Sequence, residues 1–165
     1  MSEGNGHPYS WSAIFNGYNA TFMKDCGFPV IPIYLAKQNF PADSISDARV
    51  TNIWTQSLSL SHHIAQSANI ASVNENLTDM IGEVDAILLA RDDSENHLKY
   101  AAPFINAGIP IYIDKPLATK IKDAEKILSL ERYPGQIFSC SALRFSEELT
   151  LPLKDHKRLG AINKI

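Results

Sequence analysis

Apolar residues follow two alternating spacings along the chain from about residue 49 onward. Short apolar and β-branched runs, bounded by turn residues, predict strands over 49–55, 84–90, 109–113 and 136–143. Between these runs, apolar residues recur every three to four positions and predict helices over 57–68, 98–107 and 120–128. Such strand–helix alternation is typical of right-handed βαβ units. We therefore expect an α/β fold with a doubly wound parallel sheet and helices on both of its faces.

Single residues indicate where these elements begin and end. The run 84–90 is apolar almost throughout, as in a strand buried on both faces of a parallel sheet. Thr119 is a candidate N-cap for the last helix. Gly108 suits the C′ position of the preceding helix, which Pro103 should kink.

The first 48 residues fit this alternation less well. Residues 8–17 predict a short helix, with Pro8 at its first position and Gly17 at its end. The stretch 28–34 carries two prolines and cannot be a central strand.

Composition and charge narrow the classes of protein. The chain has 165 residues, 45% of them apolar and 20% charged, which suits one globular domain or one domain with a piece of another. A net charge of −3 disfavours nucleic acid as a partner, and the basic run 154–158 is interpreted as a solvated face. No apolar stretch approaches the ~18 residues of a membrane span, and the N-terminus lacks the features of a signal peptide. We expect a cytoplasmic protein in which Cys26 and Cys140 are buried reduced thiols, and no metal site.

Ligands of open parallel sheets bind beyond the carboxyl ends of the strands, so the residues that follow each predicted strand are candidates. They are Thr55 and Gln56, the run 91–93, and the run 114–116. Lys115 would point into the ligand crevice, where it could perform acid–base chemistry, and Asp114 could orient its ammonium group. A surface lysine at a turn before Pro116 is the alternative.

A glycine turn and a histidine are weaker candidates. Gly4, Asn5 and Gly6 precede the first predicted helix, where backbone N–H groups could approach a phosphate. The full G-x-G-x-x-G pattern is not present, because position 9 is Tyr, so a flexible turn remains open. His97 could form a hydrogen bond near a cofactor or be structural. His62 and His63 are expected to face solvent.

The motifs from residue 84 to 145 resemble those of the glucose–fructose oxidoreductase / inositol dehydrogenase / MocA (Gfo/Idh/MocA) family. They are V-D-A-I at 84–87, the spaced His97, A-G-I-P-I at 107–111, D-K-P-L-A at 114–118, and R-F at 144–145. The resemblance implies a Rossmann domain that binds NAD or NADP, followed by an α/β substrate domain. It implies hydride transfer on a sugar, a cyclitol or a related hydroxy compound. It places Lys115 between nicotinamide and substrate, His97 in the cofactor region, and the phosphate loop at residues 2–7.

Several positions depart from the family pattern. Asp114 stands where the family has Glu, and Thr55 stands where an acid usually holds the adenosine ribose. No adjacent arginine marks NADP. The first Rossmann strand and the D-x-x-x-H motif of a substrate domain have no counterpart in the sequence. We therefore expect a fragment, with an incomplete Rossmann domain at 1–145 and the start of a linker or substrate domain at 146–165. Residues 31–35 are the one nearby segment that could replace the missing strand.

The sequence thus predicts the cofactor-binding domain of an NAD(P)-dependent oxidoreductase, with this chain alone inactive. Two alternatives stay open: a non-catalytic nucleotide-binding or regulatory protein of the same fold, and a redox-neutral lyase or hydrolase that uses NAD transiently. The expected partners are a sugar-like substrate and, in the full-length protein, further copies of the same chain, but neither nucleic acid nor membrane. Lys115 is the predicted catalytic residue. The predicted cofactor-binding residues are Gly4, Asn5, Gly6, His7, Ser10, Thr55, Arg91, Asp92, His97, Asp114 and Pro116.

Overall fold

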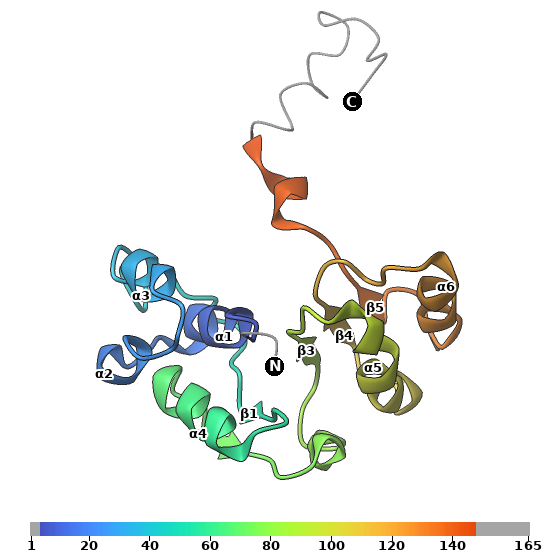
Figure 1. The fold of residues 1–165 in the computed structure, drawn as a ribbon, viewed down its shortest axis with the longest axis horizontal. Coiled ribbons are helices and arrows are strands. Elements are labelled where there is room, and N and C mark those ends of the chain that lie inside the picture. Colours follow the sequence, from blue (N-terminus) through green and yellow to red (C-terminus); the bar gives the residue numbers. More distant parts are fainter. Residues whose placement is uncertain (1–3, 148–165) are drawn as a thin grey trace, which may run out of the picture.

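The structure is a computed structural model that describes residues 4–147. Its strands form two small parallel sheets (Figure 1). In the first, β1 (Asn52–Ile53) pairs with β2 (Ser72–Val73). In the second, β3 (Ile87–Leu89), β4 (Ile111–Ile113) and β5 (Ile137–Phe138) follow one another in that order, all parallel. The predicted α/β class and the parallel direction are confirmed, while each strand is shorter than its predicted run.

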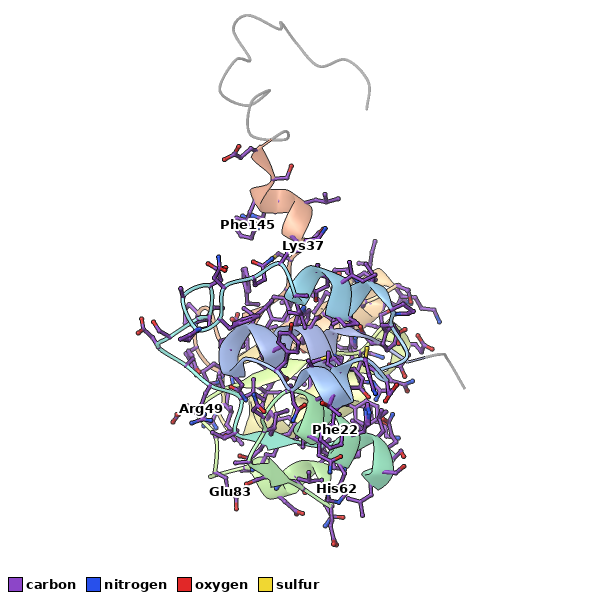
Figure 2. The ribbon with its side chains drawn as sticks, turned by 90° about the vertical axis from the view of Figure 1, so that its left-hand side faces the viewer. Phe22, Lys37, Arg49, His62, Glu83 and Phe145 are labelled. Carbon is purple, nitrogen blue, oxygen red and sulfur yellow. The ribbon has the colours of Figure 1, made fainter. Side chains whose placement is uncertain are left out.

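Helices connect these strands. They are α1 (His7–Asn16), α2 (Ala20–Met23), α3 (Val30–Leu35), α4 (Leu58–Ser67), α5 (His97–Asn106) and α6 (Ile121–Ser129). Three 3₁₀ turns lie at Leu77–Met80, Ser94–Asn96 and Ala142–Phe145. In Figure 2 the last of these turns, with the exposed Phe145, stands away from the body of the molecule.

Local sequence signals explain most of the helix ends. The Ser57 hydroxyl accepts a hydrogen bond from Leu60 N at the start of α4, as an N-cap does. Gly17 follows α1 with φ 69°, and Gly108 follows the C-cap residue of α5 with φ 80°, both in the left-handed region. The predicted cap at Thr119 is wrong, because Lys120 holds that position. Helix α1 begins at His7, so Pro8 is its second residue rather than its first.

The segment with two prolines is helix α3. Ile31 and Leu35 are 5% and 1% exposed and belong to the core that α1 and α4 also line. Moving this segment into the sheet would remove both side chains from that core. The idea that residues 31–35 replace a strand is therefore wrong.

Two separate hydrophobic cores divide the molecule. The first core lies among α1 to α4; its buried members are Tyr9, Ala13, Met23, Cys26, Ile31, Leu35, Ile64, Ala65, Ala68 and Ile70. The second lies between the three-stranded sheet and helices α5 and α6; its buried members are Met80, Ile87, Leu89, Ala101, Phe104, Ile105, Ile111, Ile113 and Ile127. Cys26 and Cys140 are free thiols, as predicted, although Cys140 is only half-buried.

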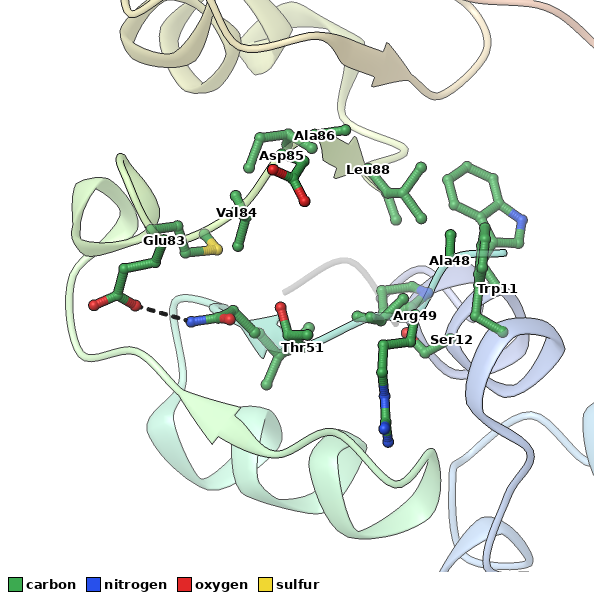
Figure 3. A pocket seen from close by; sticks show the side chains of 18 of the residues that line it. Trp11, Ser12, Ala48, Arg49, Thr51, Glu83, Val84, Asp85, Ala86 and Leu88 are labelled. Carbon is green, nitrogen blue, oxygen red and sulfur yellow. Dashed lines mark hydrogen bonds between the residues drawn. The ribbon is translucent and has the colours of Figure 1, made fainter. Parts of the chain in front are cut away.

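A groove of about 770 Å³ separates β1 from β3 (Figure 3). Within residues 4–147 no strand lies between them, since β1 pairs only with β2 and β3 only with β4. Leu88 lines this groove and is 41% exposed, so the prediction that its strand is buried on both faces is wrong. At one end, Asn52 Nδ2 donates to Glu83 Oε2 across the gap at 3.2 Å. The groove lies at the position expected for the first Rossmann strand.

Candidate functional site

The glycine turn before α1 needs its two glycines for different reasons. Gly4 has φ 78°, a conformation that side chains other than glycine rarely adopt. A Cβ on Gly6 would lie 2.9 Å from Ile31 Cδ1 and 3.1 Å from the Phe28 ring, so glycine lets the turn pack closely on these residues. The turn is therefore built for a fixed shape, which argues against the flexible alternative. Ser2 and Glu3 of the predicted phosphate loop lie outside the described residues.

The first turn of α1 uses part of its hydrogen-bonding capacity internally. Asn5 Oδ1 accepts from His7 N at 2.9 Å, and Pro8 has no N–H to offer. Ser10, a predicted cofactor ligand, is 6% exposed and donates through Oγ to His7 O at 3.4 Å. An anion at this helix end would therefore meet the backbone of the glycine turn before it met Ser10.

A second groove, of about 400 Å³, collects the ends of β1 and β3 beside the glycine turn. Five of the eleven predicted cofactor-binding residues line it: Gly4, Asn5, Thr55, Arg91 and Asp92. The groove is also lined by Gln56 and Ser57 and by two residues of the first core, Tyr9 and Cys26. The ends of β1 and β3 thus meet at one groove, whereas Gly6, His7, Ser10, His97, Asp114 and Pro116 are not among its lining residues. We call this space the strand-end groove.

Hydroxyl groups occupy the end of β1. Thr55 N donates to Ser61 Oγ at 2.9 Å, and Thr55 Oγ1 donates to Ser57 O at 2.8 Å. These contacts fix the turn into α4 and present neutral donors and acceptors to the groove. A carboxylate for the adenosine ribose is missing at this strand end, as the sequence indicated.

Arg91 and Asp93 form an ion pair at the end of β3, with Arg91 Nε donating to Asp93 Oδ1 at 2.7 Å. Burial alone would raise the pKa of Asp93, but hydrogen bonds from Arg91 and Asn96 outweigh it and lower the pKa. The Arg91 guanidinium also lies 4.1 Å from the centre of the Tyr100 ring. Arg91 is thus already engaged by two groups, whereas Asp92 is exposed.

His97 is fully buried and is not among the residues that line the strand-end groove. Its Nδ1 lies 3.0 Å from Leu117 O and its Nε2 lies 3.1 Å from Arg91 O. The imidazole therefore joins the loop after β3 to the loop after β4. These contacts favour the structural role among the two that the sequence left open, because they join the loops that carry candidate ligands.

Asp114 and Lys115 follow β4 directly. Asp114 is 1% exposed, and its Oδ1 accepts from Lys115 N at 2.7 Å. The Lys115 ammonium lies 3.8 Å from the same oxygen, and its side chain is about half exposed. Asp114 thus orients Lys115, as expected, while leaving the ammonium accessible. The peptide bond between Lys115 and Pro116 is cis.

Asp114 also reaches across to the glycine turn. Its Oδ2 accepts from Asn5 Nδ2 at 2.8 Å and lies 2.5 Å from His7 Nδ1. The His7 ring stacks on Trp11, with centroids 4.5 Å apart, and Trp11 meets Tyr112 edge-on. No spacing in the sequence indicates this contact, because the partners are more than a hundred residues apart.

The hydroxyl groups of two tyrosines, Tyr9 and Tyr112, have raised pKa values. Burial, with a smaller effect of Cys26, raises the pKa of Tyr9 to about 12. Burial and the neighbouring Cys140 raise the pKa of Tyr112. The Tyr9 hydroxyl lies 2.7 Å from His63 Nδ1, so the expectation that His63 simply faces solvent is wrong, whereas His62 is exposed. Figure 2 shows His62 on the outer side of α4.

Residues 4–147 contain neither a metal-binding cluster nor a membrane-spanning helix. No group of three or more His, Cys, Asp or Glu side chains in this part could hold a metal ion. None of its helices is long and apolar enough to cross a bilayer.

The parallel strands, the glycine turn and the strand-end groove together define a Rossmann-type nucleotide-binding domain. Residues 34–141 match the sequence profile of the Gfo/Idh/MocA family, described as an oxidoreductase family with an NAD-binding Rossmann fold. This match covers more than half of the chain, and the chain belongs to that family.

Individual relatives are more distant. The Salmonella typhimurium protein named "Putative oxidoreductase YceM" is 29% identical over 77 residues, which are 47% of this chain and 24% of that relative. The chain thus spans about a quarter of the length of this curated relative.

Solved structures share the fold at low sequence identity. Scyllo-inositol dehydrogenase from Lactobacillus casei, with NAD(H) and scyllo-inositol, matches with a TM-score of 0.57 and 16% identity over 70% of this chain and 36% of its own. Biliverdin reductase from Synechocystis, with biliverdin and NADP+, matches with a TM-score of 0.57 and 17% identity over 68% of this chain and 36% of its own. The WlbA dehydrogenase from Bordetella pertussis, with NADH and UDP-GlcNAcA, matches with a TM-score of 0.56 and 20% identity over 71% of this chain and 37% of its own. These likenesses support the Rossmann fold and nothing finer.

Proposed function

We propose that this chain supplies the cofactor-binding part of an NAD(P)-dependent oxidoreductase that acts on a sugar, a cyclitol or a related hydroxy compound. The observation that carries the proposal is the convergence of three separate segments on one place. The glycine turn, the ends of β1 and β3, and the pair Asp114–Lys115 after β4 adjoin one another through Asn5, which lines the strand-end groove and donates to Asp114. This is the arrangement by which a Rossmann domain receives a dinucleotide.

The residues present suit such a ligand. A groove of about 400 Å³ is within the usual size of ligand pockets, roughly 300–1,000 Å³. The backbone of Gly4 to Gly6 would lie against the pyrophosphate, Thr55 would face the adenosine ribose, and Lys115 would approach the nicotinamide. When bound, the cofactor supplies a hydride acceptor or donor.

The proposed role of Lys115 follows from its position. Its ammonium is held near the Asp114 carboxylate but remains half exposed, so it can donate a hydrogen bond to a substrate oxygen. Related dehydrogenases with inositol or UDP-GlcNAcA in their structures indicate hydroxy compounds as the substrate class. Residence in the cytoplasm, a homo-oligomeric state and a domain boundary near residue 145 stay predictions.

Calorimetric titration with NAD+ and NADP+ tests the binding step. We expect saturable binding of a dinucleotide by the parent, the protein that contains this chain. In Thr55→Asp, the NAD+/NADP+ affinity ratio should rise about tenfold or more, because a carboxylate binds the ribose hydroxyls and repels a 2′-phosphate.

Gln66→Asp is the matched control, since it adds the same charge at an exposed position near the other end of α4. Its ratio should equal that of the parent. Absence of dinucleotide binding by the parent, or an equal shift in both variants, would contradict the proposed site. Binding without turnover in any catalytically complete form of the protein would favour the regulatory alternative.

A further inference from the structure

Arg91, at the end of β3, has a guanidinium plane that is fixed along its rim. Its Nε donates to Asp93 Oδ1 at 2.7 Å, and its Nη2 donates to Asp93 Oδ2. Asn96 Nδ2 donates to the same Oδ2 at 2.9 Å and so holds the carboxylate. Paired hydrogen bonds between a guanidinium and a carboxylate set the direction of the plane as well as its position. The plane of Arg91 is therefore oriented before any ligand binds.

One face of this plane is covered by an aromatic ring. Arg91 Cζ lies 4.1 Å from the centre of the Tyr100 ring on α5. Trp54 packs on the same ring with centroids 5.8 Å apart, and Gln56 Nε2 donates to the Tyr100 hydroxyl at 3.4 Å. Residues from the end of β1 thus support the ring on which the guanidinium lies.

The other face of the plane is the one that a ligand can reach. Arg91 lines the strand-end groove, whereas Tyr100 does not. The Arg91 side chain is 17% exposed. Because Asp93 occupies the rim and Tyr100 covers one face, a molecule in the groove meets the remaining face of the guanidinium.

The same groove has an apolar surface that suits a flat ring. Leu60 of α4 lines it and is 41% exposed, and Ile64, a residue of the first core, lines it as well. A flat ring in this groove can stack on the guanidinium and remove apolar carbons from water. Nucleotide bases are such rings, and they stack on arginine planes when proteins bind them.

We propose that Arg91 is the stacking platform for the adenine ring of the dinucleotide, with Tyr100 as the residue that positions it; this inference rests on the NAD(P)-dependent function proposed above. Stacking depends on the flat π-system and not on the groups along its edge. The contact therefore binds the adenine half of NAD+ and of NADP+ alike. The nicotinamide half is left to the segment that follows β4.

A change from arginine to lysine separates stacking from charge. Lysine keeps the positive charge but has no plane and cannot form the paired hydrogen bonds with a carboxylate. A role of Arg91 as a cation for a phosphate would survive this change, whereas a stacking role would not. Arg49→Lys makes the same change at an exposed arginine outside the strand-end groove and is the matched control.

The test is calorimetric titration of the protein that contains this chain with NAD+ and with AMP, which carries only the adenine half of the cofactor. Arg91→Lys should raise both Kd values roughly tenfold, the order expected for the loss of one stacked base. Its kcat at saturating NAD+ should stay within a few-fold of the parent. Arg49→Lys should match the parent in all three quantities.

Two further measurements need no change at Arg91. Tyr100→Phe keeps the supporting ring and should bind AMP like the parent, whereas Tyr100→Leu removes the ring and should bind AMP several-fold more weakly. Nicotinamide hypoxanthine dinucleotide keeps the purine ring and lacks the adenine amino group. The parent should bind it within a few-fold of NAD+, because stacking does not depend on that group. Melting curves show which variants are folded.

The possible outcomes separate the two proposals. An AMP Kd in folded Arg91→Lys equal to that of the parent would overturn the stacking role alone. Equal AMP binding by folded Tyr100→Leu and Tyr100→Phe, or a loss of tenfold or more with the hypoxanthine dinucleotide, would do the same. A parent that binds no dinucleotide would overturn the proposed function itself.

Discussion

The N-terminal half, residues 4–76, packs four helices around a first core and carries only a two-stranded sheet, whereas the C-terminal half, residues 77–147, is organised by three parallel strands. The strands of the first sheet have two residues each. In the second sheet, β3 pairs with β4 over three residues. The first half is therefore stabilised mainly by helix packing, and the second by a sheet with helices against it.

The two halves meet where function is proposed. On one side of the meeting point are Asn5 and His7, and on the other are Asp114 and Lys115. The groove between β1 and β3 separates the two sheets, and no strand pairing connects them within residues 4–147 (Figure 3). The site therefore depends on a contact between two halves whose sheets do not pair with each other.

The largest expected effect concerns the edges along this groove. The edges of β1 and β3 along the groove have no strand partner within residues 4–147. A backbone group left both unpaired and shielded from water at such an edge would cost about 1–3 kcal/mol, against a domain stability of about 5–15 kcal/mol. We expect the isolated 165-residue chain to be unstable or to self-associate through β1 and β3. Size-exclusion chromatography and thermal melting check this.

Leu88→Lys places a charge in the groove and should reduce self-association. Leu128→Lys on the surface of α6 is the control and should not. A monodisperse monomer with a sharp melt above about 60 °C would show that the open edges cost little.

The next effect concerns the C-terminal side of the site. In the active protein, Lys115→Ala should lower kcat by roughly 10²–10⁴-fold, because it removes a group that touches the reacting oxygen, with little change in cofactor affinity. Steady-state kinetics and calorimetry measure the two quantities. Lys99→Ala, an exposed lysine on α5, serves as the control. Turnover within a few-fold of the parent would make Lys115 structural.

A pair of histidines compares the stability of the two halves. His97→Ala removes a fully buried ring whose two nitrogens lie against the carbonyls of Arg91 and Leu117, and at least one of these carbonyls loses its donor because even a neutral imidazole carries one N–H. We expect a loss of about 2–4 kcal/mol in the free energy of unfolding. His63→Ala removes one hydrogen bond to Tyr9 in the first half and should cost about 1 kcal/mol. Equal losses in urea denaturation would contradict this contrast.

How much the sequence could predict also differs between the halves. In the C-terminal half, β3 and β4 lie inside their predicted ranges and α5 begins one residue before its own, because apolar periodicity is strong where a sheet and a helix bury each other. In the N-terminal half, α3 was not predicted, because it starts directly after Pro29 and contains Pro32, and proline inside a segment argues against a helix. Strand β2 escaped because two residues, Ser72 and Val73, carry no periodic signal.

The candidate site divides in the same way. Lys115 and the strand ends were predictable because topology brings the carboxyl ends of parallel strands together. The contact of His7 with Asp114 was not, because it depends on how the two halves are placed relative to one another. Burial of Ser10 and His97 depends likewise on packing, which local residue patterns do not report.

A further expected effect is an alkaline transition in the N-terminal core. The pKa of Tyr9 is raised from 10.0 to about 12, so the folded state holds this proton more tightly than the unfolded state. The related stability is fully present below pH 10 and is lost as the pH rises towards about 12, by about 2 kcal/mol. Urea denaturation of the parent at both ends of this range measures the loss.

Tyr9→Phe should remove that pH-dependent loss while keeping the ring packed. Tyr133→Phe, on the surface of the C-terminal half, should keep it. The same alkaline loss in Tyr9→Phe as in the parent would assign it to another group.

The most direct measurement is a crystal structure of the protein with NAD+ or NADP+ bound. The account predicts a dinucleotide that spans both halves, with its pyrophosphate against the backbone of residues 4–10 and its nicotinamide beside Lys115. A dinucleotide bound away from residues 4–10, or confined to one half of the molecule, would contradict it.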